Sequence, residues 1–222
     1  EEGGRATLAL DVVVKPEPRA YFPGADLASG DFTSGYAVSG LRASADGSVC
    51  VDGRCERYDG AIAYKDHNWG VWRGVSWEWG ELRAGPYALL WGRVDPPDTL
   101  GTRSPLFAYL VDSLGFVALF RPREVAYEDA RAIVVDGREV RVPARASFVD
   151  VRGADTLRVE LEVEDAVGTD TRRAAVGRNE EGGDRRITRP YFIQMKGRAR
   201  LTGRVGGAVV RGDGPAFFET YR

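Results

Sequence analysis

The segment Tyr64-Lys65-Asp66-His67-Asn68-Trp69-Gly70 decides how this chain is interpreted, because it places the only histidine of the 222 residues beside a tryptophan. Three more tryptophans, Trp72, Trp77 and Trp79, follow before residue 80, and the fifth is Trp91. Such a cluster can line an apolar cavity that contains a proton-handling group. It can equally be an aromatic core that contains one structural histidine.

Residues two apart on a β-strand lie on the same face. The segment 55–69 alternates as a strand does, which predicts that His67 and Trp69 share one face and that Tyr64 and Asp66 share the other.

The next two predicted strands, 71–82 and 87–95, turn at Arg83-Ala84-Gly85-Pro86 and carry the remaining aromatic candidates. Alternation places Trp77 and Trp79 on one face of the first strand. If the strands are neighbours, the tryptophans and the histidine can line one interior.

Composition limits the class of protein. The chain has 31 basic and 33 acidic residues and is 43% hydrophobic, so it carries no surplus of positive charge for nucleic acid. No apolar run reaches the length of a membrane span, which leaves only peripheral membrane contact open. The 28 glycines and 11 prolines punctuate alternating apolar segments, and this pattern predicts an all-β fold.

The two cysteines flank an Asp52-Gly53 pair, the preferred sequence of a two-residue type I′ hairpin turn. Val51 and Arg54 would form the pair beside the turn, and Cys50 and Cys55 would face each other in the next pair. A disulfide and two free thiols both remain open. A disulfide would favour an extracytoplasmic location, and free thiols a cytoplasmic one. Two cysteines on one hairpin are too few for a structural metal site.

The run Asp95-Pro96-Pro97-Asp98 ends the strands before it and makes residues 96–105 the best linker. The tetrapeptide Val51–Arg54 recurs at residues 135–138, which favours two related β units. We therefore predict one unit at residues 1–98 and a second at residues 99–222.

The cluster contains the groups that acid-initiated chemistry needs. His67 can exchange a proton near neutral pH, and a desolvated Asp95 could stay protonated and act as a general acid. Tryptophan faces can stabilise a carbocation formed from an isoprenoid or polyene, or hold a substrate for ring closure. The alternative is that His67 is structural and that Asp95 is a turn residue before two prolines.

We take His67, Asp95 and Asp66 as candidate catalytic residues. The candidate substrate-binding residues are aromatic: Tyr64, Trp69, Trp72, Trp77, Trp79 and Trp91.

The stretch Asp66-His67-Asn68-Trp69-Gly70 resembles the D-H-x-W-G motif of the AttH-like/CrtC-like lipocalin-fold family. This family includes the carotenoid 1,2-hydratases (hydroxyneurosporene synthases) and the lipocalin-like Diels–Alderases and cyclases. The likeness extends to the segment 41–54, to the tryptophan-rich strand at 77–79, and to the closing residues 195–219.

The resemblance implies two consecutive lipocalin-like antiparallel β-barrels or sandwiches and no metal or organic cofactor. Only 65 residues precede the motif, so we expect the first barrel to be shortened. In the family's hydratases a histidine, a tryptophan and a later aspartate are associated with the site, and these fall on His67, Trp69 and Asp95.

The sequence thus leads to two hypotheses. The first is a cofactor-independent hydratase (a lyase) or cyclase that acts on a hydrophobic isoprenoid or polyketide-like substrate. The second is a non-catalytic lipocalin-like carrier of a hydrophobic small molecule.

Overall fold

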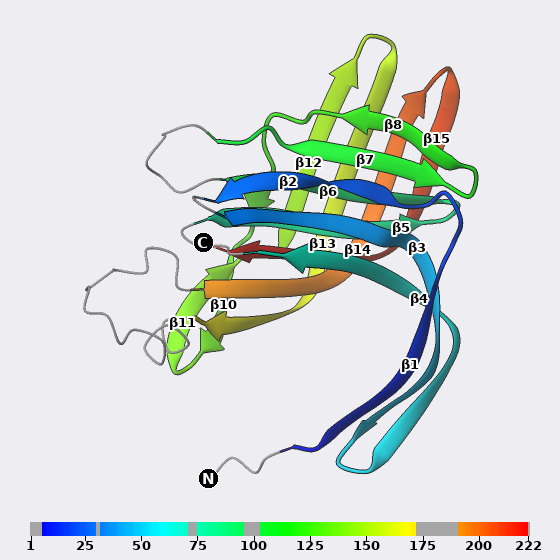
Figure 1. The fold of residues 1–222 in the computed structure, drawn as a ribbon. Helices are drawn as coiled ribbons and strands as arrows, with labels where there is room; N and C mark the ends of the chain where they lie inside the picture. Colours follow the sequence, from blue (N-terminus) through cyan, green and yellow to red (C-terminus); the bar gives the residue numbers. More distant parts are fainter. Residues whose placement is uncertain (1–5, 30–31, 71–74, 96–102, 172–190, 222) are drawn as a thin grey trace. The chain divides into compact units, whose positions relative to one another are not determined.

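The computed structural model describes residues 6–29, 32–70, 75–95, 103–171 and 191–221, and it is built from β-strands (Figure 1). The all-β prediction is therefore confirmed. The part of the chain that the structure describes contains no helix of the length and apolarity that crossing a membrane requires. The strands are β1 (Leu8–Pro16), β2 (Phe22–Ser29), β3 (Phe32–Val51), β4 (Arg54–Trp69), β5 (Ser76–Ala84), β6 (Tyr87–Asp95), β7 (Phe107–Asp112), β8 (Gly115–Phe120), β9 (Ala126–Glu128), β10 (Arg131–Val135), β11 (Arg138–Val142), β12 (Arg145–Arg152), β13 (Asp155–Asp170), β14 (Tyr191–Val205) and β15 (Ala208–Tyr221).

The chain divides into two compact units, and each is described by itself. The first comprises residues 1–70 with 113–115, and the second comprises residues 71–112 with 116–222. The linker predicted at 96–105 lies largely in residues 96–102, outside the described residues.

The first unit is a four-stranded antiparallel sheet organised around the long strand β3. One edge of β3 pairs with β4, and the other edge is shared by β2 and β1. The β3–β4 register shifts at three places, between Val38 and Gly40, between Gly40 and Ala43, and between Ala45 and Gly47. Such irregularities bend a strand pair, and β3 and β4 curve along their length in Figure 1.

The predicted hairpin ends this sheet. Asp52 and Gly53 have φ of 50° and 79°, the positive values that a type I′ turn requires. Cys50 pairs with Cys55 across the strands and the two form a disulfide, so the disulfide alternative is confirmed. The repeated tetrapeptide forms the same turn between β10 and β11, where Asp136 has a φ of 47°.

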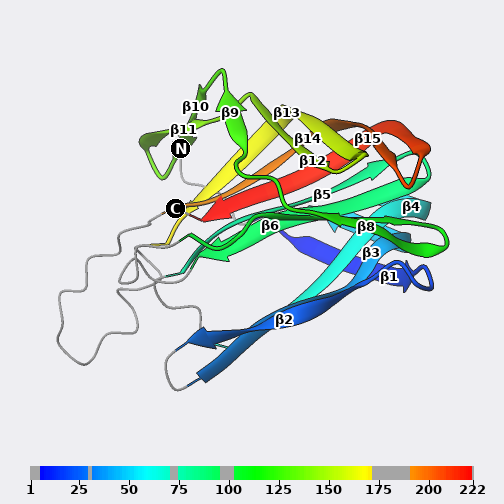
Figure 2. The same ribbon diagram turned by 90° about the horizontal axis from the view of Figure 1, so that it is seen from above.

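The second unit is dominated by a nine-stranded sheet with the order β8-β7-β6-β5-β15-β14-β13-β12-β9. Its neighbours are antiparallel, and it curls as a lipocalin-like half-barrel, which Figures 1 and 2 show from two directions. β10 and β11 form a separate two-stranded sheet.

The nine-stranded sheet includes β5 and β6, which the sequence analysis assigned to the first unit. β5 pairs with β15 from Trp77–Tyr221 to Leu82–Ala216, and β6 pairs with β7. Hairpin signals in a sequence identify only the partner that is nearby in the chain. The pairing with β15 joins residues about 140 positions apart and was not predictable from them.

One face of this sheet carries the hydrophobic core of the second unit. Residues of alternating position along its strands are buried together, and the completely buried members include Leu82, Leu89, Trp91, Leu110, Phe120, Leu157, Val159 and Leu201. This face is filled with side chains in the way that the interior of a small barrel is filled.

Two tryptophan–glycine pairs cross from β5 to β6. Trp79 lies opposite Gly92, and Trp91 lies opposite Gly80. A Cβ added to Gly80 would lie 2.5 Å from the ring of Trp91, and one added to Gly92 would lie 2.8 Å from the ring of Trp79. Each ring therefore occupies the space that a side chain on the opposite strand would need.

We predict that Gly80→Ala lowers the free energy of unfolding by about 1–3 kcal/mol, because the new methyl group overpacks the site against Trp91. Urea denaturation measures the change. The matched control is the same substitution in a Trp91→Leu background, where the smaller side chain makes room and the cost should shrink. An equal cost in both backgrounds would refute the clash.

Candidate active site

His67 and Trp69 lie near the end of β4, on the same face of the strand. Their ring centroids are 5.7 Å apart with an interplanar angle of 25°, so the predicted shared face is confirmed. Both side chains are exposed, Trp69 to 37%. The Trp69 ring also covers Gly35 of β3, where an added Cβ would approach it to 2.4 Å.

Tyr64 and Asp66 lie on the opposite face of β4. The hydroxyl of Tyr64 donates to Oδ2 of Asp66 at 3.1 Å. This contact confirms that the two residues share a face, and it shows that Asp66 is directed away from the His67 imidazole.

The tryptophans of the second unit are divided between the two faces of its sheet. Trp77 and Trp79 lie on one face, whereas Trp91 is opposite Gly80 and lies on the other. Trp91 is completely buried in the core. The described tryptophans of this unit therefore do not line one wall together, and Trp72 lies outside the described residues.

Aromatic partners surround Trp77 and Trp79. The indole Nε1 of Trp77 donates to Glu219 at 2.9 Å, and its ring stacks on Tyr221 with centroids 4.7 Å apart. Trp79 meets Phe107 edge to face at 5.6 Å. These contacts make an aromatic surface over β5, β7 and β15.

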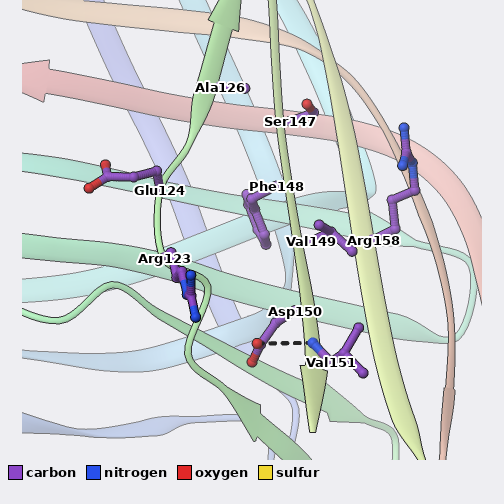
Figure 3. Close-up of a pocket in the computed structure, with 9 residues that line it drawn as sticks. All are labelled: Arg123, Glu124, Ala126, Ser147, Phe148, Val149, Asp150, Val151 and Arg158. Carbon is purple, nitrogen blue, oxygen red and sulfur yellow. Dashed lines mark hydrogen bonds between the residues drawn. The ribbon is translucent and has the colours of Figure 1, made fainter.

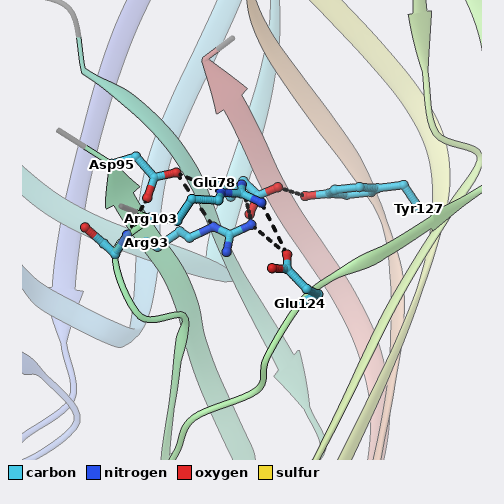
Figure 4. A network of polar contacts seen from close by, with 7 residues as sticks. Glu78, Arg93, Asp95, Arg103, Glu124 and Tyr127 are labelled. Carbon is cyan, nitrogen blue, oxygen red and sulfur yellow. Dashed lines mark hydrogen bonds and ion pairs between the residues drawn. The ribbon is translucent and has the colours of Figure 1, made fainter. Parts of the chain in front are cut away.

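Asp95 is the last residue of β6 and is buried among hydrogen-bond donors (Figure 4). The backbone N–H of Ser104 donates to its Oδ1 at 2.7 Å. Its Oδ2 lies 3.4 Å from Nε of Arg103 and 3.9 Å from Nε of Arg93. Asp95 is the acceptor in each of these contacts.

Arg93 lies at the centre of this polar network, which we call the Arg93 network. Its Nη2 lies 2.8 Å from Oε2 of Glu78 and donates to Oε2 of Glu124 at 3.0 Å. The Tyr127 hydroxyl donates to Glu78 at 2.8 Å, and Arg103 donates to Glu124 at 3.3 Å. Figure 4 shows these side chains converging from β5, β6, β9 and the segments that precede β7 and β9.

The network sets the charges of its members. Burial acts to lower the pKa of Arg93, but the hydrogen bond to Glu124 and the charges of Glu78, Glu124 and Asp95 outweigh it, so the pKa lies above its ordinary value. The hydrogen bond from Arg93 holds the pKa of Glu124 below its ordinary range. Both shifts favour the charged forms of Arg93 and Glu124, which bind each other.

Glu81 has the opposite environment. It lies two residues after Trp79 on β5, opposite Leu90 of β6 and Phe217 of β15, so apolar side chains flank it on both sides. Its Oε2 is buried and has no hydrogen-bond partner among the described residues. Burial raises the pKa of Glu81 from 4.5 to about 7, against the opposing charge of Arg83. Glu81 can therefore hold a proton near neutral pH and give it up.

Glu81 is not among the candidates predicted from the sequence, although the sequence contains a signal for it. The alternation that places Trp77 and Trp79 on one face places Glu81 there too. A carboxyl group at an expected apolar position is a recognised sign of a functional site, because its pKa is shifted by desolvation.

The candidate residues divide between the two units. His67, Trp69, Tyr64 and Asp66 belong to the first, and the Arg93 network, Glu81, Trp77 and Trp79 belong to the second. Each group is therefore described within its own unit.

Comparison with solved structures identifies the fold. The chain is similar to kievitone hydratase from Nectria haematococca, with a TM-score of 0.56 and 17% identity over 90% of this chain and 55% of that one. It is similar to CghA, with a TM-score of 0.58 and 15% identity over 100% and 62% of the two chains. It is also similar to a protein of Nitrosomonas europaea described as a candidate AttH, with a TM-score of 0.55 and 16% identity over 96% and 61%.

The chain thus has the AttH-like lipocalin fold, as the motif around His67 predicted. It spans between 55% and 62% of the length of these three structures. No family model matches the chain, and no curated protein matches it.

We predict that Arg93→Met lowers the free energy of unfolding by about 3–5 kcal/mol, because it removes the buried cation that lies 2.8 Å from the buried Glu78 carboxylate. Thermal and urea unfolding measure the loss. Arg103→Met is the matched control, since the Arg103 side chain is 56% exposed and its loss should cost no more than about 1 kcal/mol. Similar losses for the two variants would contradict the central place of Arg93.

We predict that Glu81 makes the protein less stable as the pH rises from about 4.5 to about 7. The folded protein holds the Glu81 proton more tightly than the unfolded chain, so across this window folding takes up a proton and the free energy of unfolding falls. The full effect is about 3 kcal/mol. Glu81→Gln should remove it and be more stable than wild type at pH about 8.

Urea denaturation across this pH range measures the effect. Glu139→Gln, at an exposed position of β11, makes the same chemical change and should keep the wild-type pH profile. A pH profile left unchanged by Glu81→Gln would contradict the raised pKa of Glu81.

Proposed function

We propose that this chain is part of a cofactor-independent hydratase or cyclase that acts on a hydrophobic isoprenoid or polyketide-like substrate, with Glu81 as its acid. The observation that carries the proposal is the buried Glu81 carboxyl, which retains a proton near neutral pH beside Trp79. A catalytic acid works best when its pKa lies near the working pH.

The chemistry balances without a cofactor. Glu81 would transfer its proton to one carbon of a substrate double bond, which leaves a carbocation on the other carbon. The face of Trp77 or Trp79 would stabilise that cation. Water would then add and release a proton that restores Glu81. Alternatively, a second double bond of the substrate would attack and close a ring, and the cation that this leaves would lose a proton from a neighbouring carbon back to Glu81.

His67 and Trp69 have a separate proposed role in the first unit. Their exposed and stacked rings can hold an apolar group and orient a substrate or a water molecule. Tyr64 and Asp66, which bond to each other on the opposite face of β4, would support the strand that carries His67. Asp95 would position the Arg93 network rather than donate a proton.

The comparisons support the class of reaction. Kievitone hydratase is named for a hydration, and CghA has also been solved with Sch210972, a structure to which this chain is similar with a TM-score of 0.52. Both likenesses are to chains longer than this one. The substrate assigned to this chain rests on its own aromatic and carboxyl side chains.

The packing of Trp77 and Trp79 also supports a second candidate function, the binding of a hydrophobic small molecule without catalysis. Trp77 and Trp79 are both held by aromatic neighbours, as in an apolar wall that only binds. A carrier of a hydrophobic small molecule would use this wall with Glu81 and His67 as structural groups.

We predict that the purified chain converts members of a panel of isoprenoid, polyene and polyketide-like alkenes, and that Glu81→Gln lowers kcat by about a hundredfold or more. The assay is mass spectrometry in H₂¹⁸O, which distinguishes hydration by its isotope label from ring closure without a change of mass. His67→Ala should lower turnover with a change in KM, because it removes an orienting contact.

Glu139→Gln is the matched control and should keep wild-type activity. Wild-type turnover by both Glu81→Gln and His67→Ala would refute the proposed roles. An unaltered hydrophobic molecule that co-purifies in native mass spectrometry, with no turnover of the panel, would establish the carrier instead.

A further inference from the structure

Two hydrogen bonds that involve side chains, rather than a backbone ladder, link the two ends of the curled nine-stranded sheet. Its terminal strand β8 approaches β12, and side chains make the contacts between them. Nη1 of Arg152 donates to the carbonyl of Leu119 at 2.9 Å, and the N–H of Arg121 donates to Oδ2 of Asp150 at 2.7 Å. We call this junction the seam of the second unit.

A pocket of about 510 Å³ lies at the seam, between the segment that leads into β9 and the strand β12 (Figure 3). This volume is in the range of pockets that hold small organic ligands. The pocket, which we call the seam pocket, is lined by Arg123, Glu124, Ala126, Ser147, Phe148, Val149, Asp150, Val151 and Arg158.

The backbone of β12 offers a free donor to this pocket. β9 pairs with β12 only at residues 145–147, so β12 has no strand partner on that side beyond Ser147. The N–H of Val163 donates to the carbonyl of Ala144, so these two residues are a hydrogen-bonded pair of the β12–β13 ladder. Hydrogen-bonded pairs alternate along an antiparallel ladder, so the even-numbered residues of β12 bond to β13 and the odd-numbered ones do not. The N–H and C=O of Val149 therefore point off the free edge.

The charged groups that line the pocket are unequally occupied. Glu124 is bound to the Arg93 network, and Asp150 accepts from two backbone N–H groups. Arg158 is paired with Glu160. Arg123 has no ion-pair or hydrogen-bond partner among the described residues. The carboxylates that line the pocket therefore already have partners. The positive charge of Arg123 has none among the described residues, so it is available to an anion.

The same pocket has an apolar side. The ring of Phe148 is held against Trp91 of the core, with centroids 5.5 Å apart. Val149 and Val151 are 55% and 64% exposed, so they offer apolar surface to a ligand. A guanidinium, a backbone N–H and an apolar surface therefore meet within one pocket.

We propose that the seam pocket binds a small molecule that carries a carboxylate on an apolar body. The carboxylate would bind Arg123 and the N–H of Val149, since both are donors that suit an anion. The apolar body would cover the exposed side chains of Val149 and Val151, which lie on the same face of β12. The groups that would bind this ligand, Arg123, Val149 and Val151, have no role in the proposed reaction, so the site stands or falls separately from that reaction.

The test is a ¹H–¹⁵N NMR titration of the full chain with 4-phenylbutyrate and, as a neutral match, 4-phenylbutyramide. We expect saturable shifts of the Val149 and Val151 amides with the acid, and affinity at least about tenfold weaker for the amide. Arg123→Gln should weaken binding of the acid about tenfold and leave binding of the amide unchanged.

Arg138→Gln, on the exposed side of β11, makes the same change of charge and should bind the acid as wild type does. Equal affinity for acid and amide would overturn the proposal, as would shifts that map away from the seam. The absence of saturable shifts up to the solubility limit of the acid would overturn it too. Turnover of alkenes by the same samples reports on the proposed reaction alone, so either conclusion can fail without the other.

Discussion

The antiparallel ladder between β5 and β15 is the interaction on which the second unit depends. It joins residues 77–82 to residues 216–221. The ladder thereby connects the β8-β7-β6-β5 half of the sheet to the β15-β14-β13-β12-β9 half. Without this ladder, β8, β7, β6 and β5 would be a separate four-stranded sheet with an open edge at β5. Such an edge is a site for unwanted pairing, and closing it is costly in chain entropy because the loop is long.

β5 lies in the middle of the sheet, so both of its edges are paired, and its two faces have different chemistry. On one face Gly80 makes room for Trp91 of the core, and on the other Gly92 makes room for Trp79. Glu81 occupies the second face two residues after Trp79, where water is largely excluded and its carboxyl group has few partners. The pairing with β15 places Phe217 beside Glu81, so the ladder that joins the sheet also supplies one apolar neighbour of this carboxyl group.

The features that the sequence predicted correctly depend on neighbours in the chain. The Asp52-Gly53 turn fixed the facing of Cys50 and Cys55, and strand alternation fixed the shared face of His67 and Trp69. What could not be predicted depends on distant pairing. Asp95 was expected at the end of the first unit, but donors from the segment that follows it bind its carboxylate. Its partner Arg93 also binds Glu124, which comes after β8 in the chain. Strand alternation predicts that Glu81 shares a face with Trp79. It does not predict the apolar neighbours of Glu81, which β6 and β15 supply.

Two carboxyl groups of the second unit show how that environment divides their chemistry. Glu124 accepts hydrogen bonds from two arginines, and its pKa is held below the ordinary range. Glu81 is flanked by Leu90 and Phe217, and its pKa is raised to about 7. The two environments shift the pKa values of two chemically identical groups in opposite directions. The arginine-bound Glu124 is suited to remain charged, and the isolated Glu81 is suited to transfer a proton. By this argument the acid of a proton-initiated reaction belongs on the aromatic face of β5, and the arginine-bound carboxylates belong to the framework that holds β5 and β6 together.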